Sequence, residues 1–206
     1  MSEVPRSMEA TSAGATAAVV RSRRAQPNGW WGIALLIATE AALFGTLIAS
    51  YFYLQIENPV WPPPGVTVPD PVSPSVLTAV LVLTSVPMWL AARAVRTGAV
   101  HRIRLLLLGA AAVDIAYLVL QLHAFTDELA KHGPKGSAYS SIYYTLLATH
   151  HAHVAIGILL LVGILIKLRT GLTAYRGTGV RAIALYWHFT NVVAVAVLLT
   201  QMSPRL

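Results

Sequence analysis

The sequence WWGIALLIATEAALFGTLIASYFYLQI at residues 30–56 contains one carboxylate and no other charged side chain across 27 positions. An α-helix needs about 20 such residues to cross the roughly 30 Å hydrocarbon layer of a bilayer. Four further apolar stretches follow, at residues 75–95, 103–125, 139–168 and 182–202. The sequence therefore predicts an all-α fold, an integral membrane bundle of five transmembrane helices.

The composition of the whole chain agrees with a membrane protein. Of the 206 residues, 56% are hydrophobic and only 11% are charged, against about 25% charged in a typical soluble domain. A soluble enzyme is excluded because too few charges remain to cover its surface, and a disordered regulator is excluded because such chains are poor in apolar residues. The absence of cysteine also excludes disulfides, thiolate metal sites and a cysteine nucleophile.

The positive charges predict the orientation of the bundle. Only three of the 15 Lys and Arg residues lie on the side of the membrane that the chain reaches after the first, third or fifth stretch: Lys131, Lys135 and Arg205. The other 12 precede the first stretch or lie in and next to the two connections that join stretches two and three and stretches four and five. The positive-inside rule then places the N-terminus in the cytoplasm and the C-terminus outside. The net charge of +7 thus indicates topology, not a nucleic-acid partner.

Three regions depart from regular apolar helix. Residues 1–29 are rich in Ala, Ser, Thr and Arg, which predicts a disordered cytoplasmic tail ahead of a transmembrane domain at 30–206. The outer loop 57–74 holds seven of the twelve prolines, and because proline restricts the backbone we expect a stiff strap across the outer face. Pro87, inside the second stretch, predicts a kink.

Two carboxyl groups are expected at membrane depth, Glu40 and Asp114. A charged carboxylate there costs roughly 2.5–3.5 kcal/mol on insertion scales, so each should be protonated, hydrogen-bonded or turned toward protein. Each is either a proton-handling group or a structural hydrogen-bonding group between helices, and Asp114 is expected to meet Glu40 or a histidine. Small residues at four-residue spacing around Glu40 would let another helix approach closely.

The fourth stretch carries three histidines in the sequence THHAH at residues 149–153. His150 and His153 share a helix face, and His151 points about 100° away. A metal site completed by a buried carboxylate is conceivable, as is a haem ligated by His150 or His153 with His188. The ligands are few, so we predict no metal on this chain and structural histidines that contact a buried carboxylate.

The start of the fifth stretch carries residues typical of interfaces. A Tyr-Trp pair at 186–187 is typical of an anchor at the membrane surface. The two polar residues that follow it are suited to inter-helix hydrogen bonds, and together with Arg181 they are candidates to hold a phospholipid headgroup. The residues expected at lipid or helix interfaces are Trp31, Arg181, Trp187, His188 and Asn191.

The order and spacing of several motifs resemble subunit III of the haem–copper oxidases, the cytochrome c oxidase subunit III family. The motifs are WG at 31–32 with IATEA at 37–41, WPPPG at 61–65, LQ at 120–121, YSSIYY at 139–144, HxxHVxxG at 150–157 and YWHF at 186–189. The resemblance covers about residues 29–203. It is greatest to the bacterial five-helix form, which lacks the first two helices of longer members.

Four positions depart from the family pattern. Asn191 replaces a carboxylate, Ala124-Phe125 replaces Glu-Tyr, His151 replaces a glycine, and Asp114 has no counterpart. An accessory subunit associated with nitric oxide reductases, from the same family, resembles the chain almost as well and remains an alternative.

The resemblance implies a subunit without catalytic residues or bound haem and copper, which belong to subunits I and II. It implies packing against subunit I, bound phospholipid and support of proton uptake in a proton-pumping cytochrome c or quinol oxidase of the bacterial plasma membrane. Glu40 matches the family's intramembrane glutamate, and His150, His153 and His188 match its buried histidines.

The same residues suit two other classes of function. A proton or metal transporter would use Glu40, Asp114 and the histidines, but the chain shows no internal repeat and few spans. A membrane metalloenzyme built on the histidine cluster is disfavoured by the small number of ligands.

Overall fold

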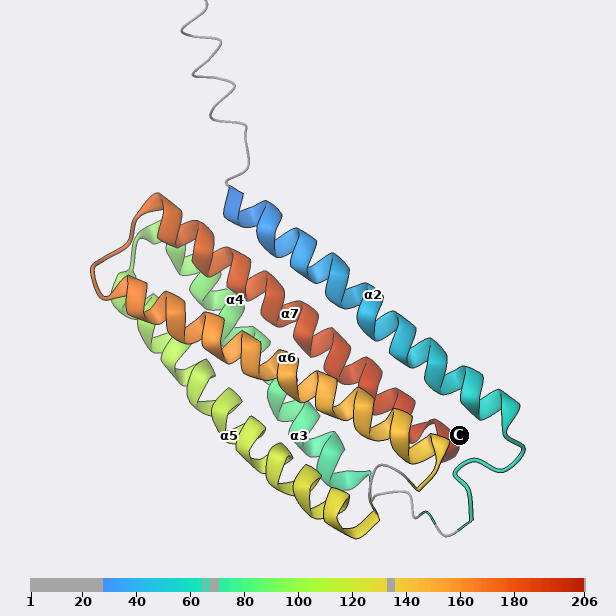
Figure 1. Ribbon diagram of the computed structural model, residues 1–206. Helices are drawn as coiled ribbons and strands as arrows, with labels where there is room; N and C mark the ends of the chain where they lie inside the picture. Colours follow the sequence, from blue (N-terminus) through green and yellow to red (C-terminus); the bar gives the residue numbers. More distant parts are fainter. Residues whose placement is uncertain (1–27, 65, 67–70, 133–135, 206) are drawn as a thin grey trace, which may run out of the picture.

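The computed structural model describes residues 28–64, 66, 71–132 and 136–205, and within these ranges its regular structure is helical (Figure 1). The helices are α2 (Asn28–Glu57), α3 (Val72–Leu83), α4 (Ser85–Ala94), α5 (Val100–His132), α6 (Ala138–Leu168) and α7 (Ala174–Met202), with short 3-10 turns η1 (Val95–Thr97) and η2 (Ser203–Arg205). Within the described ranges, five segments are long and apolar enough to span a membrane, because α3, α4 and η1 form one span. The predicted five-span all-α fold is confirmed. Most of the predicted tail, residues 1–27, and part of the outer loop lie outside the described residues.

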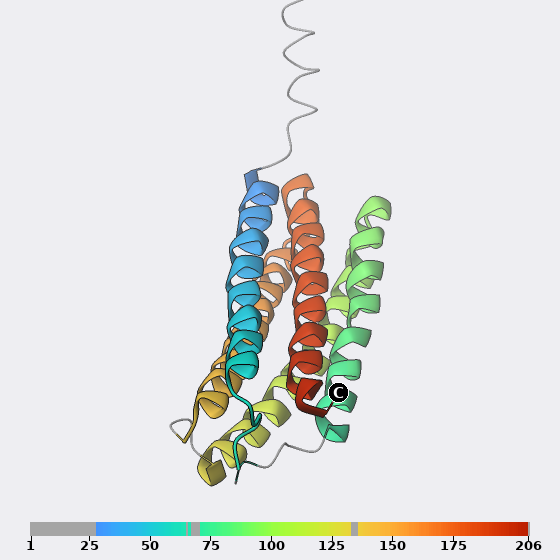
Figure 2. The ribbon, with the colours of Figure 1, turned by 90° about the vertical axis from the view of Figure 1, so that its right-hand side faces the viewer.

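Helix α7 lies at the centre of the bundle. It packs against α2, α3, α4 and α6, and α5 packs against α4 and α6. In its most apolar window, 56% of α7 is buried, compared with 11% for α2. Helix α2 lies along one side of the bundle against α6 and α7 (Figures 1 and 2). Among the five spans, α7 is therefore the most buried and α2 the most exposed.

The second span is interrupted at Thr84, between α3 and α4. The backbone N–H and the side-chain hydroxyl of Thr84 both donate to the Leu81 carbonyl, at 3.1 and 2.6 Å. Pro87 has no N–H to offer the Leu83 carbonyl four residues earlier, so regular helical bonding cannot continue through this turn. The interruption lies where Pro87 predicts a kink, and it turns the Thr84 side chain toward the bundle core, where it is buried.

Two helices extend beyond the predicted stretches. Helix α7 begins at Ala174 rather than at residue 182, with the Thr173 hydroxyl accepting a hydrogen bond from the Arg176 amide. Arg176 and Arg181 lower the hydropathy of the first two turns, which hides their helical character from a search for apolar runs. Helix α5 likewise continues past residue 125 to His132.

Aromatic residues hold the described part of the outer loop against the helices. Trp61 packs against Tyr51 of α2 and Tyr139 of α6, with ring centroids 5.5 and 5.0 Å apart. Its indole N–H donates to the Tyr51 hydroxyl at 3.1 Å. Trp61 thus fixes the first half of the loop over the α2–α6 contact.

Candidate functional site

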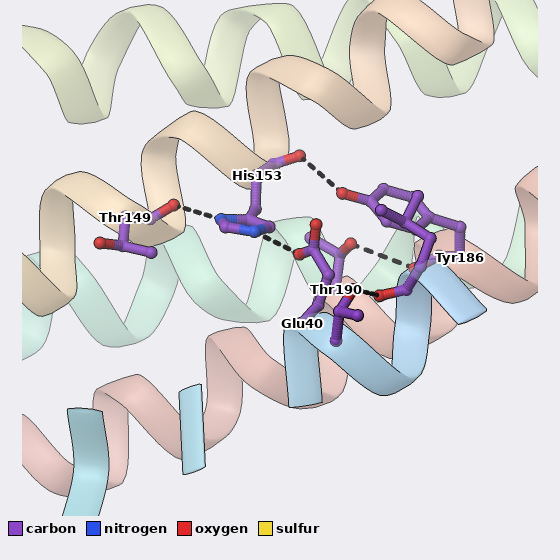
Figure 3. A network of polar contacts seen from close by, with 7 residues as sticks. Glu40, Thr149, His153, Tyr186 and Thr190 are labelled. Atoms are coloured by element: carbon purple, nitrogen blue, oxygen red, sulfur yellow. Dashed lines mark hydrogen bonds and ion pairs between the residues drawn. The ribbon is translucent and has the colours of Figure 1, made fainter. Parts of the chain in front are cut away.

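A buried polar pair joins α2 to α6 near the middle of the bundle (Figure 3). The Glu40 carboxyl contacts Nε2 of His153, and the two residues are 7% and 9% exposed. Glu40 lies twelve residues into α2 and His153 fifteen residues into α6, which places them about 18 and 22 Å from the two opposite faces of the bundle at which these helices begin. The pair is therefore far from both aqueous phases.

The hydrogen bonds of His153 determine where its protons lie. Nδ1 of His153 is 2.6 Å from the Thr149 carbonyl, and because a carbonyl only accepts, Nδ1 carries a hydrogen. Nε2 therefore faces Glu40 either as the acceptor of a carboxylic acid proton or as the protonated side of an imidazolium beside a carboxylate. Both arrangements place one proton between Nε2 and the carboxyl oxygen and leave the pair neutral overall.

Side chains of three helices surround this pair. Phe44, one turn after Glu40, packs edge-on against the His153 ring with centroids 4.9 Å apart. The Tyr186 hydroxyl donates to the His153 carbonyl at 3.4 Å, and the Thr190 hydroxyl donates to the Tyr186 carbonyl at 3.1 Å (Figure 3). Three helices, α2, α6 and α7, thus hold the proton-sharing pair in place.

The other two histidines of α6 face different partners. Nε2 of His150 lies 3.4 Å from the Tyr117 hydroxyl, which also accepts a hydrogen bond from Gln121 at 3.4 Å. His151 packs edge-on against Phe125, with centroids 5.6 Å apart. Among the described residues, no three His, Asp or Glu side chains are arranged to hold a metal ion. The three histidines therefore do not converge on one centre.

A second buried polar cluster surrounds the Thr84 interruption. The Trp187 indole N–H donates to the Thr84 hydroxyl at 2.9 Å, and the Asn191 amide donates to the Ser85 hydroxyl at 2.7 Å. Thr84 also faces the carboxyl of Asp114, although neither carboxyl oxygen makes a hydrogen bond of good geometry with the described residues. This cluster ties α5 and α7 to the connection between α3 and α4.

Two sequence-based expectations are wrong here. Asp114 lies beside Thr84, not beside a histidine or Glu40, whose partner is His153. Trp187 is 0% exposed, as is Tyr186, so the pair does not anchor the membrane surface. The reason is the early start of α7, which places Trp187 thirteen residues, or about 20 Å, into the helix.

Close packing of Trp187 depends on a glycine in α6. A Cβ placed on Gly157 would overlap the six-membered part of the Trp187 ring. The absence of a side chain at this position lets the indole lie directly against the α6 backbone. Gly157 and Trp187 therefore fix the distance between the two most buried helices.

The remaining interface candidates lie in different environments. Trp31 is 60% exposed near the start of α2, and Arg181 is exposed on the first turns of α7. His188 is half-buried, whereas Asn191 is buried against Ser85 and is not available to a headgroup together with Arg181.

Four residues that complete these clusters were not identified from the sequence: Phe44, Thr84, Ser85 and Tyr117. Tyr117 lies three residues after Asp114 and four before Gln121, so helical spacing could have indicated it. The partners of the other three residues are set by tertiary packing, which cannot be predicted from the sequence of a single helix.

Comparison with known proteins identifies the family. The model of the cytochrome c oxidase subunit III family matches residues 6–202. Cytochrome c oxidase subunit 3 of Thermostichus vulcanus is 27% identical over 164 residues, covering 79% of this chain and 80% of that protein. Quinol oxidase subunit 3 of Bacillus spizizenii is 29% identical over 171 residues, covering 80% of each chain. Cytochrome bo(3) ubiquinol oxidase subunit 3 of Pseudomonas aeruginosa is 28% identical over 172 residues, covering 82% of each. The match extends over all five spans and includes both buried polar clusters, so this chain belongs to the cytochrome c oxidase subunit III family.

Proposed function

We propose that this chain is the non-redox subunit III of a haem–copper terminal oxidase in the respiratory chain of a bacterial plasma membrane. The observation that carries the proposal is the family match over residues 6–202, together with relatives named for cytochrome c and for quinol oxidases. In this role the chain stabilises the catalytic subunit and supports proton uptake. The electrons come from cytochrome c or from quinol and pass through partner subunits.

Docking on subunit I is supported by the exposed side of α2. Only 11% of the most apolar window of α2 is buried within the chain. Ala38, Ala41, Gly45 and Ala49 are exposed along it, and small residues at this spacing allow a neighbouring helix to approach closely. Together with subunit II, subunit I would carry the haem and copper.

We expect no haem or copper on this chain, because its histidines do not converge on one centre. His153 uses both ring nitrogens, on Thr149 and Glu40, whereas His150 and His151 face Tyr117 and Phe125. We assign to the Glu40–His153 pair the holding of one proton at mid-membrane, next to the α2 surface that would meet subunit I.

Phospholipid binding is supported by a cavity at the opposite end of the bundle from the outer loop. It has a volume of about 230 Å³ and lies between α2, α6 and α7. Lys167, Tyr175 and Arg176 line it together with apolar residues. Cationic side chains beside an apolar cavity at the cytoplasmic surface suit an anionic headgroup and its acyl chain.

The orientation remains the one predicted from the charges, with the N-terminus in the cytoplasm and the C-terminus outside. Lys167 and Arg176 then lie at the cytoplasmic end and Trp61 at the outer end.

Gentle detergent extraction of the tagged chain tests the proposal through subunit identification and an optical spectrum. Co-purification with a large subunit that contains haem and copper, and that reduces oxygen, is the expected result. A nitric oxide reductase partner, a haem-free homo-oligomer or stoichiometric iron or zinc on this chain alone would each overturn it. They would point to a reductase accessory subunit, a transporter and a metalloenzyme, respectively.

A further inference from the structure

A groove runs along the contact between α5 and α6 (Figure 1). It has a volume of about 530 Å³, which lies within the range of roughly 300–1,000 Å³ that is usual for ligand sites. The groove is separate from the cavity that contains Lys167, because that cavity lies between α2, α6 and α7. Helix α6 therefore separates two distinct sites at the same end of the bundle.

The groove extends from the end of the bundle toward its middle. At the end of the bundle it is lined by Arg104, in the second turn of α5, and by Arg169, the residue that follows α6. It reaches Ile115 of α5, which is eleven residues, or about 16 Å, from Arg104. This length is about half of the roughly 30 Å hydrocarbon layer, which corresponds to one leaflet of the bilayer. The rest of the lining is aliphatic: Leu108, Ala111, Ala112, Val162, Leu165 and Ile166.

The two arginines give this end of the groove a positive charge that no carboxylate balances. The Arg104 guanidinium donates to the Leu168 carbonyl in the last turn of α6, which holds its side chain beside Arg169. Neither arginine forms an ion pair with a carboxylate among the described residues. The acidic residues that the structure describes lie in the middle of the bundle or toward its outer-loop end: Glu40, Glu57, Asp114, Asp127 and Glu128.

An anionic phospholipid fits both parts of the groove. Guanidinium groups bind phosphate through paired hydrogen bonds, and arginines near the membrane surface attract anionic lipids. An acyl chain of the same lipid would lie along the aliphatic part of the groove, whose length matches one leaflet. A free phosphate ion would leave that part uncovered, and phosphatidylcholine would bring its own ammonium group close to the two arginines.

We propose that the groove between α5 and α6 binds an anionic phospholipid, with its phosphate on Arg104 and Arg169 and an acyl chain along the helices as far as Ile115. The site requires only that the helices span a membrane, so it does not depend on the oxidase role or on the orientation of the chain. It also stays open when subunit I docks on α2, because α2 and α5 pack against different sides of α6 (Figure 1).

Photo-crosslinking from inside the groove tests the site in the assembled complex. Leu108 and Ile166 line the groove and are 53% and 57% exposed, so each is replaced singly by benzoylphenylalanine. Leu105 of α5, which is 56% exposed and does not line the groove, is the matched control. The complex is irradiated in vesicles that contain equal amounts of phosphatidylglycerol and phosphatidylcholine. Mass spectrometry of this chain then gives the ratio of the two lipid adducts.

The ratio of phosphatidylglycerol to phosphatidylcholine adducts at Leu108 and Ile166 should exceed the ratio at Leu105 at least about fivefold. A factor of five corresponds to about 1 kcal/mol, the contribution of one arginine near an anionic surface. Arg169→Gln should therefore lower the ratio in the groove about fivefold. Arg102→Gln removes an exposed arginine of α5 that does not line the groove, and it should leave the ratio unchanged. Equal ratios in the groove and at the control position, equal effects of the two substitutions, or crosslinks to a partner subunit in place of lipid would each overturn the proposal.

Discussion

Replacing Glu40 by glutamine should leave the assembled complex as stable as the parent, whereas replacing it by leucine should weaken it. Nδ1 of His153 is committed to the Thr149 carbonyl, so Nε2 of a neutral His153 needs a donor from α2. A glutamine amide supplies that donor, and leucine does not. An unpaired buried acceptor costs about 1–3 kcal/mol, which is about 5–150-fold in an assembly constant.

The assay is the temperature at which the purified complex loses this chain in detergent. Thr39→Leu is the matched control, since its hydroxyl bonds the Leu36 carbonyl within the same helix. Infrared spectroscopy adds a direct readout, because a neutral Glu40 contributes a carboxylic acid C=O band that Glu40→Gln removes.

The reasoning is refuted if Glu40→Gln dissociates as readily as Glu40→Leu and no acid band is lost. Glutamine would then leave a buried imidazolium unpaired, which costs about 3–5 kcal/mol, and Glu40 would be ionised beside His153. If Glu40→Gln assembles normally but turns over or pumps less, the shared proton takes part in proton uptake.

Three further predictions follow from the packing and the topology. Gly157→Ala should destabilise the complex by about 1–3 kcal/mol through overlap with Trp187. Gly109→Ala in α5, where a Cβ meets nothing within 4 Å, should be neutral or slightly stabilising, and equal thermal stabilities of the two variants would contradict this. Trp187→Phe should cost about 1 kcal/mol in thermal unfolding because the bond to Thr84 is lost, and an unchanged midpoint would count against that bond. A reporter fused after Leu206 should be active outside the cytoplasm, and a cytoplasmic signal would reverse the topology.

The apolar runs were sufficient to predict the number of spans, because the cost of burying charge in hydrocarbon leaves few other solutions. Boundaries were less certain where charged side chains occupy helical turns. Arg176 and Arg181 led to a start for α7 that was eight residues too late, an error of about 12 Å in depth. That error made Trp187 look like a surface anchor rather than a core residue.

Which groups meet inside the bundle could be predicted only in part. The sequence indicated that a buried carboxyl would contact a histidine of α6, and Glu40 contacts His153. It did not indicate that His150 would face Tyr117 instead. His150 and His153 are separated by one helical turn and about 60° of rotation, which is enough to place them on different sides of Phe44.

Removing this chain from the assembled oxidase is the most direct test of its role as a supporting subunit. Detergent depletion of the purified complex is followed by haem and copper analysis, the initial turnover rate and the number of turnovers before activity is lost. The predicted result is an unchanged metal content and initial rate, with earlier loss of activity during turnover. Haem or copper leaving with this chain, or an unchanged lifetime without it, would contradict the account.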